Sequence, residues 1–144
     1  ADQAMALNSS VIAVQEVPPE EVSRYGIIAG EPLNDRLTRV RRLVEKPPLS
    51  EAPSRMAVAG RYILSPAVLG YIRRQKQGAL GEIQLTDAIA AMMADEPVHA
   101  WRYEGKRYDC GSKQGFLRAT VELGLQHPDV GADFREYLKT LQLD

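Results

Sequence analysis

The chain has 144 residues, a formal net charge of −1 at pH 7, and 44% hydrophobic and 26% charged residues. This balance is typical of an ordinary soluble globular domain, and with an aromatic content of 6% it argues against a nucleic-acid-binding protein. No apolar run approaches the ~20 residues of a membrane span. The length and composition predict one domain. A single cysteine, Cys110, excludes an internal disulfide and suits a reducing compartment, so we expect a cytoplasmic protein.

The N-terminal part begins with the end of a helix over residues 1–8, and Val11–Val14 follows as an apolar strand buried on both faces. Strands of this kind lie inside a sheet, so we expect an N-terminal portion of the protein to be missing from this chain. Turn and acidic residues then fill 18–34. Within them, Gly26 either lets backbone approach a ligand closely or only serves a turn.

A strand over 37–44 ends at Glu45-Lys46-Pro47-Pro48, where two opposite charges stand side by side. Adjacent side chains on a strand point to opposite faces, so Glu45 and Lys46 can pair only if the chain bends, and the prolines supply that bend. Ligands of open α/β sheets bind at the carboxyl ends of strands. A carboxylate there can accept hydrogen bonds from sugar hydroxyls and an ammonium can meet a phosphate. Two solvated charges are the plainer alternative.

The same strand carries a local cluster of four arginines: Arg36, Arg39, Arg41 and Arg42. Such a cluster on a strand flanked by acidic residues is typical of a solvated face or a subunit contact. It does not by itself predict nucleic-acid binding, because neither the net charge nor the aromatic content supports that function.

The middle of the chain predicts a strand over 56–64 and then two helices. Small residues in that strand, Gly60 among them, leave room either for a ligand or for a close-packed helix. Ser65-Pro66 starts a helix, with a capping hydroxyl before proline, and Val68, Leu69 and Ile72 give it an apolar stripe. A second helix runs to Met93 with Leu85, Ile89, Met92 and Met93 at helical spacing.

Acidic residues Glu82 and Asp87 stand near the start of that second helix. Negative charge is favoured there by the helix dipole, which accounts for most of their presence. A polar loop facing a sugar is the functional alternative.

The C-terminal part alternates as a half-buried strand over 98–103, in which we interpret His99 as structural. Asp109 then stands just before a helix that Ser112 caps and that runs to about His127, with Leu117, Val121 and Leu125 as its stripe. Assistance to that cap is the plain interpretation of Asp109. A last helix is predicted over 133–143, with Phe134, Leu138 and Leu141 inward.

Five motifs in fixed order carry a resemblance that covers about Val11 to Leu141. They are Ser23-Arg24-Tyr25-Gly26, Val44-Glu45-Lys46-Pro47, Gly60-Arg61-Tyr62-Ile63-Leu64, Gly81-Glu82-Ile83-Gln84-Leu85-Thr86-Asp87-Ala88-Ile89 and Gly105-Lys106-Arg107-Tyr108-Asp109-Cys110-Gly111. In this order and spacing the chain resembles bacterial UTP–glucose-1-phosphate uridylyltransferases, which are sugar nucleotidyltransferases. The resemblance implies an α/β fold, here a portion of a doubly wound, Rossmann-like sheet with C-terminal helices. The whole chain, 1–144, would be the C-terminal, sugar-phosphate-binding half, without the N-terminal nucleotide-binding half.

The resemblance also implies roles for individual residues. Glu45 would accept hydrogen bonds from glucose hydroxyls, Lys46 would bind the sugar phosphate and act in catalysis, and the backbone of Gly26 would meet the sugar. Asp109 would be a catalytic Mg2+ ligand, a role that suits a hard cation. The remaining substrate-binding residues would be Val58, Gly60, Tyr62, Glu82 and Asp87.

The implied reaction makes UDP-glucose and pyrophosphate from UTP and glucose 1-phosphate, and the fragment alone is expected to be inactive. The implied partners are these substrates, the missing half of the enzyme and further copies of the chain in a homo-oligomer, with no nucleic acid and no membrane. Two alternatives stay open. A related enzyme such as a thymidylyltransferase shares the Glu-Lys-Pro strand, and an assembly module could keep the fold without catalysis.

Overall fold

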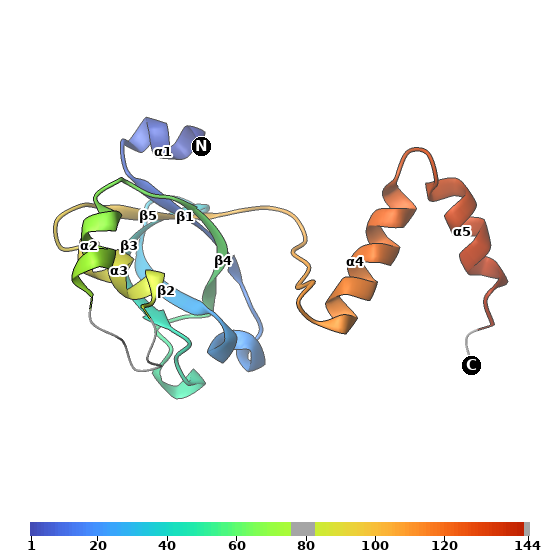
Figure 1. The fold of residues 1–144 in the computed structure, drawn as a ribbon, viewed down its shortest axis with the longest axis horizontal. Helices are drawn as coiled ribbons and strands as arrows, with labels where there is room; N and C mark the ends of the chain where they lie inside the picture. Colours follow the sequence, from blue (N-terminus) through green and yellow to red (C-terminus); the bar gives the residue numbers. More distant parts are fainter. Residues whose placement is uncertain (76–82, 143–144) are drawn as a thin grey trace. The chain divides into compact units, whose positions relative to one another are not determined.

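The computed structural model describes residues 1–75 and 83–142 and divides the chain into two compact units, Ala1–Tyr103 and Glu104–Asp144. The first unit contains all the strands of the described part (Figure 1). Its elements are α1 (Asp2–Leu7), β1 (Ser10–Glu16), η1 (Pro19–Arg24), β2 (Gly26–Pro32), β3 (Leu37–Glu45), η2 (Leu49–Glu51), β4 (Met56–Ile63), α2 (Val68–Arg74), α3 (Leu85–Met92) and β5 (Val98–Arg102). The second unit holds α4 (Lys113–Gln126) and α5 (Gly131–Thr140).

The strands form one closed sheet in the order β1-β4-β2-β3-β5. Only β1 and β5 run parallel, and the other neighbours are antiparallel. As predicted, β1 is an interior strand, because it pairs with β4 on one side and β5 on the other. The predicted α/β class is confirmed, and the portion of the fold that this chain supplies is mainly antiparallel.

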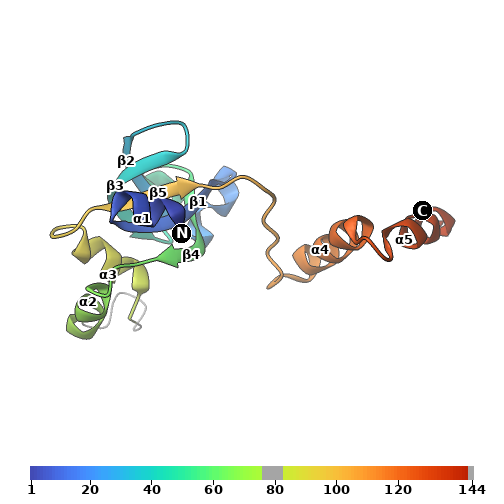
Figure 2. The ribbon, with the colours of Figure 1, turned by 90° about the horizontal axis from the view of Figure 1, so that it is seen from above.

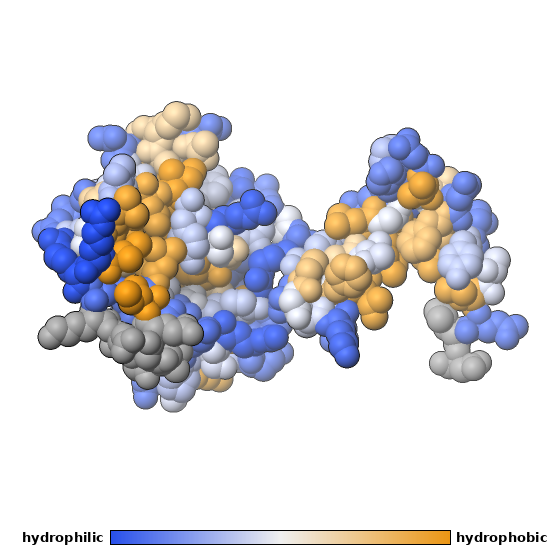
Figure 3. Space-filling model, in the orientation of Figure 1, coloured by the Kyte–Doolittle hydropathy of each residue, from blue (hydrophilic) through white to orange (hydrophobic). Residues whose placement is uncertain are grey.

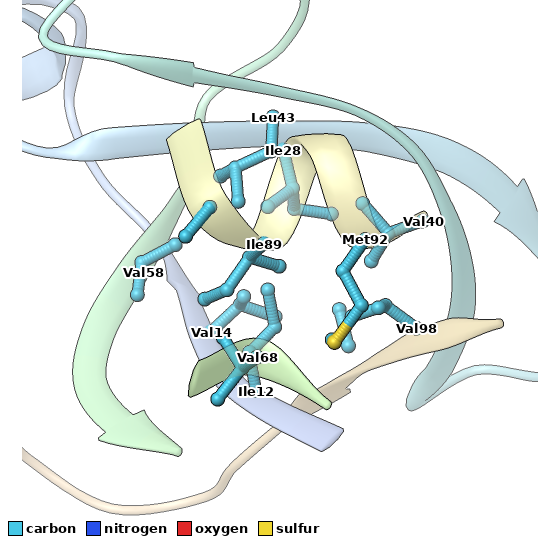
Figure 4. Packing of buried hydrophobic residues seen from close by; sticks show 12 residues of the cluster. Ile12, Val14, Ile28, Val40, Leu43, Val58, Val68, Ile89, Met92 and Val98 are labelled. Carbon is cyan, nitrogen blue, oxygen red and sulfur yellow. The ribbon is translucent and has the colours of Figure 1, made fainter. Parts of the chain in front are cut away.

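The helices α2 and α3 lie side by side against this sheet (Figures 1 and 2). The apolar spacing of α3 explains its place, since Ile89 and Met92 are fully buried among side chains from all five strands and α2 (Figure 4). Burying two such side chains contributes roughly 1.5–3 kcal/mol each. The core therefore fixes α3, and with it the first turn of that helix, against β3.

Three sequence predictions need correction in the first unit. Residues 26–32 form β2, whereas the sequence indicated turns, because two glycines and a proline obscured the short apolar run Ile27-Ile28. The helix α2 begins at Val68 and not directly after Ser65 as predicted. The Ser65 hydroxyl accepts a hydrogen bond from the Ala67 N–H at 3.2 Å, before the helix starts. Leu69, expected in the buried stripe, is 53% exposed.

In the second unit the cap by Ser112 is confirmed, since its hydroxyl accepts the Gly115 N–H at 3.0 Å. The last helix spans Gly131–Thr140 and so begins and ends earlier than predicted. Apolar side chains gather on the visible face of α4 and α5 (Figure 3). Leu117 and Val121 of the predicted stripe are exposed, and Leu141 lies beyond the helix.

Candidate functional site

The carboxyl end of β3 brings together the charged pair that the sequence singled out. The strand ends at Glu45, and Lys46 takes a left-handed backbone conformation with φ of +43°. Its N–H donates to the Tyr25 carbonyl at 3.0 Å. The ammonium of Lys46 then lies 3.9 Å from Oε1 of Glu45, so the predicted bend is confirmed.

The bend is located at Lys46 and not, as predicted, at the prolines. Pro48 is extended, with φ of −60° and ψ of 149°, and a proline ring cannot supply a positive φ. Lys46 is therefore the residue that turns the chain. Positive φ is uncommon outside glycine, so this backbone is specified by its surroundings, including the hydrogen bond to Tyr25.

Gly26 lies opposite Glu45 on the neighbouring strand β2. A Cβ atom added at Gly26 would stand 2.9 Å from Cγ2 of Thr86 and 3.1 Å from Oε2 of Glu45. Those distances are shorter than ordinary contacts, so a larger residue would displace the carboxylate. The glycine therefore has a packing role beside Glu45, whatever ligand its backbone meets.

Thr86 is the residue at this site that sequence reasoning missed. Its hydroxyl donates to Oε2 of Glu45 at 2.8 Å, and the residue is only 5% exposed. Glu45 keeps a side-chain exposure of 21%, so its carboxylate is held on one side and reaches solvent on the other. A threonine at a helix start is ordinarily interpreted as a cap, which concealed its contact with a strand 41 residues earlier.

The predicted pocket residues on β4 differ in how near they lie to this carboxylate. Val58 is buried, and its Cγ2 lies 3.6 Å from the Cβ position of Gly26. Partial burial, reinforced by the negative charge of Glu45, raises the pKa of the Tyr62 hydroxyl. Gly60 has φ of +73° and lies where the β1–β4 register shifts, with open space at its Cβ position. The expected room in this strand is therefore present at Gly60.

The two acidic residues expected near the sugar have different outcomes. Asp87 is exposed in the first turn of α3, directly after Thr86. Glu82 lies outside the described residues. The site as described thus gathers Gly26, Glu45, Lys46, Val58, Tyr62 and Thr86, with Asp87 alongside.

Asp109 belongs to the second unit, where short-range contacts hold it. Its Oδ1 accepts the Gly111 N–H at 3.2 Å, and its carbonyl accepts the Ser112 hydroxyl at 3.0 Å. A Cβ at Gly115 would fall 2.0 Å from that carbonyl, so only glycine permits this approach of helix to turn. The backbone that carries the Asp109 carboxylate is therefore fixed at the N-terminus of α4.

A metal site formed by the chain itself is not observed within residues 1–75 and 83–142. No group of three or more His, Cys, Asp and Glu side chains converges there. Nor is any helix of that part long and apolar enough to cross a membrane.

Comparison with known proteins places the chain in a family. Residues 1–125 match the family model described as Nucleotidyl transferase, and the chain belongs to that family. Nucleotidyltransferases of this kind typically use a divalent metal.

Within the family, the predicted resemblance to UTP–glucose-1-phosphate uridylyltransferases is confirmed. The protein of that name from Pseudomonas aeruginosa is 50% identical over 77% of this chain and 40% of its own length. The one from Staphylococcus epidermidis is 43% identical over 93% of this chain and 46% of its own length. A solved UDP-glucose pyrophosphorylase complexed with UDP-glucose superposes with a TM-score of 0.83 at 38% identity, covering 88% of this chain and 48% of that one. The chain spans about half the length of the curated relatives it matches.

Proposed function

We propose that this chain is the sugar-phosphate-binding half of a UTP–glucose-1-phosphate uridylyltransferase, which forms UDP-glucose and pyrophosphate. The observation that carries the proposal is the pairing of Glu45 and Lys46 at the end of β3, with Glu45 held by Thr86. The names of the relatives support the choice of UTP and glucose 1-phosphate. Assembly into a homo-oligomer and a cytoplasmic location stay predictions.

The sugar would occupy the solvent-facing side of Glu45. With Oε2 engaged by Thr86, Oε1 and the outer lone pairs can accept hydrogen bonds from sugar hydroxyls. Val58 and Tyr62 supply apolar walls, and the open space at Gly60 gives the ring room. Asp87 and Glu82 are proposed to contact the sugar from the start of α3 and the segment before it.

The sugar phosphate would lie against Lys46. Its ammonium is half-exposed and only 3.9 Å from a carboxylate oxygen, a weak ion pair that leaves the cation available. During transfer a phosphate oxygen of glucose 1-phosphate attacks the α-phosphorus of UTP, one P–O bond forms and the bond to pyrophosphate breaks. Lys46 keeps the attacking phosphate in place and offsets its charge, which is a positioning and electrostatic role.

Asp109 is proposed as one ligand of Mg2+. A carboxylate oxygen is the donor that this cation prefers, and Mg2+ is usually bound by one or two carboxylates together with substrate phosphates. Asp109 fits that arrangement, since it offers a carboxylate oxygen and its backbone is held at the start of α4. When bound, the ion neutralises phosphate charge.

The proposal is tested by assaying the 144-residue chain for pyrophosphate release and by calorimetric titration with glucose 1-phosphate. We expect weak sugar-phosphate binding without turnover, because the groups that align UTP would be in the missing half and that alignment supplies several kcal/mol of the barrier. Binding should disappear in Lys46→Ala and persist in Lys139→Ala, an exposed lysine of α5.

Turnover comparable to a full-length relative would contradict the assignment of this chain as a half-enzyme. An intact-mass measurement of the natural protein supplies a second test, since a gene product of about 144 residues is inconsistent with it. In the complete enzyme, parallel assays with UTP and dTTP separate uridylyl from thymidylyl transfer.

A further inference from the structure

A cluster of three side chains ties the segment before α4 to the middle of that helix. Glu122 of α4 accepts the Tyr108 hydroxyl on Oε2 at 2.6 Å and forms an ion pair with the Lys106 ammonium through Oε1. The ammonium also lies 5.4 Å from the centre of the Tyr108 ring. Both oxygens of one carboxylate thus hold side chains of a single segment.

This segment contains Asp109, which is anchored on each side. Tyr108 and Lys106 precede it and are bound to Glu122, while Ser112 and Gly115 follow it at the entrance of the helix. The two anchor points, Ser112 and Glu122, are roughly 15 Å apart along α4 at 1.5 Å per residue. Asp109 therefore lies in a segment that is held at two separate places on α4.

The protonation states favour these contacts at neutral pH. The hydrogen bonds from Lys106 and Tyr108 hold the pKa of the Glu122 carboxyl below its ordinary value, and the hydrogen bond to Glu122 raises the pKa of the Tyr108 hydroxyl. The carboxylate stays ionised and the phenol stays protonated. The Glu122 side chain is also 35% exposed, and an ion pair of this exposure contributes little to stability. Its main effect is accordingly on orientation.

We propose that Glu122 is a positioning residue that orients the Asp109 carboxylate toward the divalent metal. The inference rests on the proposed function, which gives Asp109 to the metal. Without Glu122 the anchor before Asp109 is lost, and the segment can pivot about the Ser112 cap. A group hydrogen-bonded directly to a metal ligand typically changes metal affinity 10- to 100-fold. Glu122 acts one step further away, through Tyr108 and Lys106, so we expect an effect at the lower end of that range.

The experiment measures Mn2+ binding to the complete enzyme that contains this chain, by electron paramagnetic resonance of free Mn2+ in the presence of UDP-glucose. Glu122→Ala removes both contacts, and we expect about tenfold weaker Mn2+ binding. Glu122→Gln can still accept the Tyr108 hydrogen bond but loses the ion pair, so its loss should be smaller. Glu136→Ala is the matched control, since it removes an exposed carboxylate that pairs with Lys139 on α5.

Thermal unfolding of each variant separates orientation from stability. Mn2+ affinity within twofold of the unaltered enzyme in a folded Glu122→Ala variant overturns the proposal, whatever the melting temperature. If that variant does not fold, Glu122→Gln decides, and an unchanged affinity there overturns the proposal equally. Asp109→Asn tests the underlying assignment by itself. If it leaves Mn2+ affinity unchanged, Asp109 is not a metal ligand, and the metal part of the proposed function fails.

Discussion

The two units hold their candidate functional carboxylates in different ways. In the first unit, Glu45 is fixed by Gly26 on the neighbouring strand and by Thr86, far along the chain. In the second, Asp109 is fixed at its backbone and its Oδ1 atom by Gly111, Ser112 and Gly115, all within six residues of it. The first site depends on packing between distant segments, whereas the second depends on contacts between one segment and the helix that follows it.

The two units also differ in how much side-chain volume they bury behind these sites. The first unit buries large side chains completely, among them Ile12, Ile27, Ile89 and Met92. The described part of the second unit buries only Ala119 and Gly131, both small. A substitution in the first unit therefore acts through a core, whereas one in the second acts on a turn and its helix.

The largest expected effect is that of Lys46→Ala in the complete enzyme. Loss of the cation that we propose to bind the sugar phosphate should lower kcat/KM for glucose 1-phosphate roughly 100- to 1,000-fold. The affinity for UTP should remain nearly unchanged. Steady-state kinetics measures both, with Lys139→Ala of α5 as the control. A collapse of UTP affinity with intact sugar-phosphate affinity would show that the lysine has another role.

The second-largest effect is expected for Glu45→Gln. The binding free energy of glucose 1-phosphate should weaken by roughly 1.5–3 kcal/mol, the range for a hydrogen bond to a charged group. An amide accepts fewer hydroxyl donors than a carboxylate. Glu31→Gln is the control, since Glu31 is exposed on β2 and pairs with Arg41. Unchanged KM and kcat would rule out contact between Glu45 and the sugar.

Thr86→Val removes a hydroxyl while nearly preserving the volume of the side chain. It therefore tests whether a tertiary contact in the first unit orients Glu45. We expect the binding free energy of glucose 1-phosphate to weaken by about 1.5 kcal/mol, because Glu45 loses a charge-assisted hydrogen bond that orients it. The loss should be measured as a higher KM for glucose 1-phosphate. The KM for UTP should not change. Thr120→Val, whose hydroxyl bonds only locally to the Phe116 carbonyl of α4, serves as the comparison.

Gly115→Ala tests how far the local contacts at the start of α4 stabilise the second unit. Its Cβ would overlap the Asp109 carbonyl, so the Ser112 cap should open at a cost of about 1 kcal/mol in the free energy of unfolding. Gly70→Ala is the matched change in α2, where the nearest atom is 3.9 Å away, and it should stabilise by roughly 0.5–1 kcal/mol. Denaturant titration measures both. Equal shifts in the two variants would contradict the close approach.

The smallest expected effect is the pH dependence contributed by His99. Burial, and secondarily the charge of Arg39, lower the pKa of this imidazole in the folded state below its ordinary 6.5. The unfolded chain then binds the proton more readily, so the stability contributed by His99 is complete above pH 6.5 and is lost as the pH falls through the lowered folded value. Urea titrations at pH 7.5 and 5.5 should therefore show a smaller acid loss in His99→Gln than in the unaltered chain. His127→Gln, at an exposed position, should behave like the unaltered chain.

Local chemistry explains what could be predicted from the sequence. The Ser112 cap, the apolar spacing of α3 and the double burial of β1 each depend on residues close together in the chain, and each is confirmed. The bend after Glu45 was also predicted, because opposite charges at adjacent strand positions require one. The family resemblance rested on the same kind of short motif.

Tertiary contacts explain what could not be predicted. The bond from Thr86 to Glu45 joins positions 41 residues apart, and no spacing rule connects a helix start to a strand end. Closure of the sheet depends on strand pairs such as β3 with β5, whose order is absent from the sequence pattern. The strand β2 was missed because its apolar run is only Ile27-Ile28 beside a glycine.

The left-handed backbone of Lys46 limits how position 46 can evolve. Glycine and asparagine tolerate that conformation but carry no cation, arginine keeps a cation but must adopt the same uncommon φ, and β-branched residues are excluded by sterics. If Lys46 binds the sugar phosphate as proposed, its charge and its backbone conformation are selected together at this one position. A library varied only at position 46 would recover few functional alternatives. Substitutions at neighbouring positions would first have to change the conformation of the turn. Only then could another residue replace Lys46.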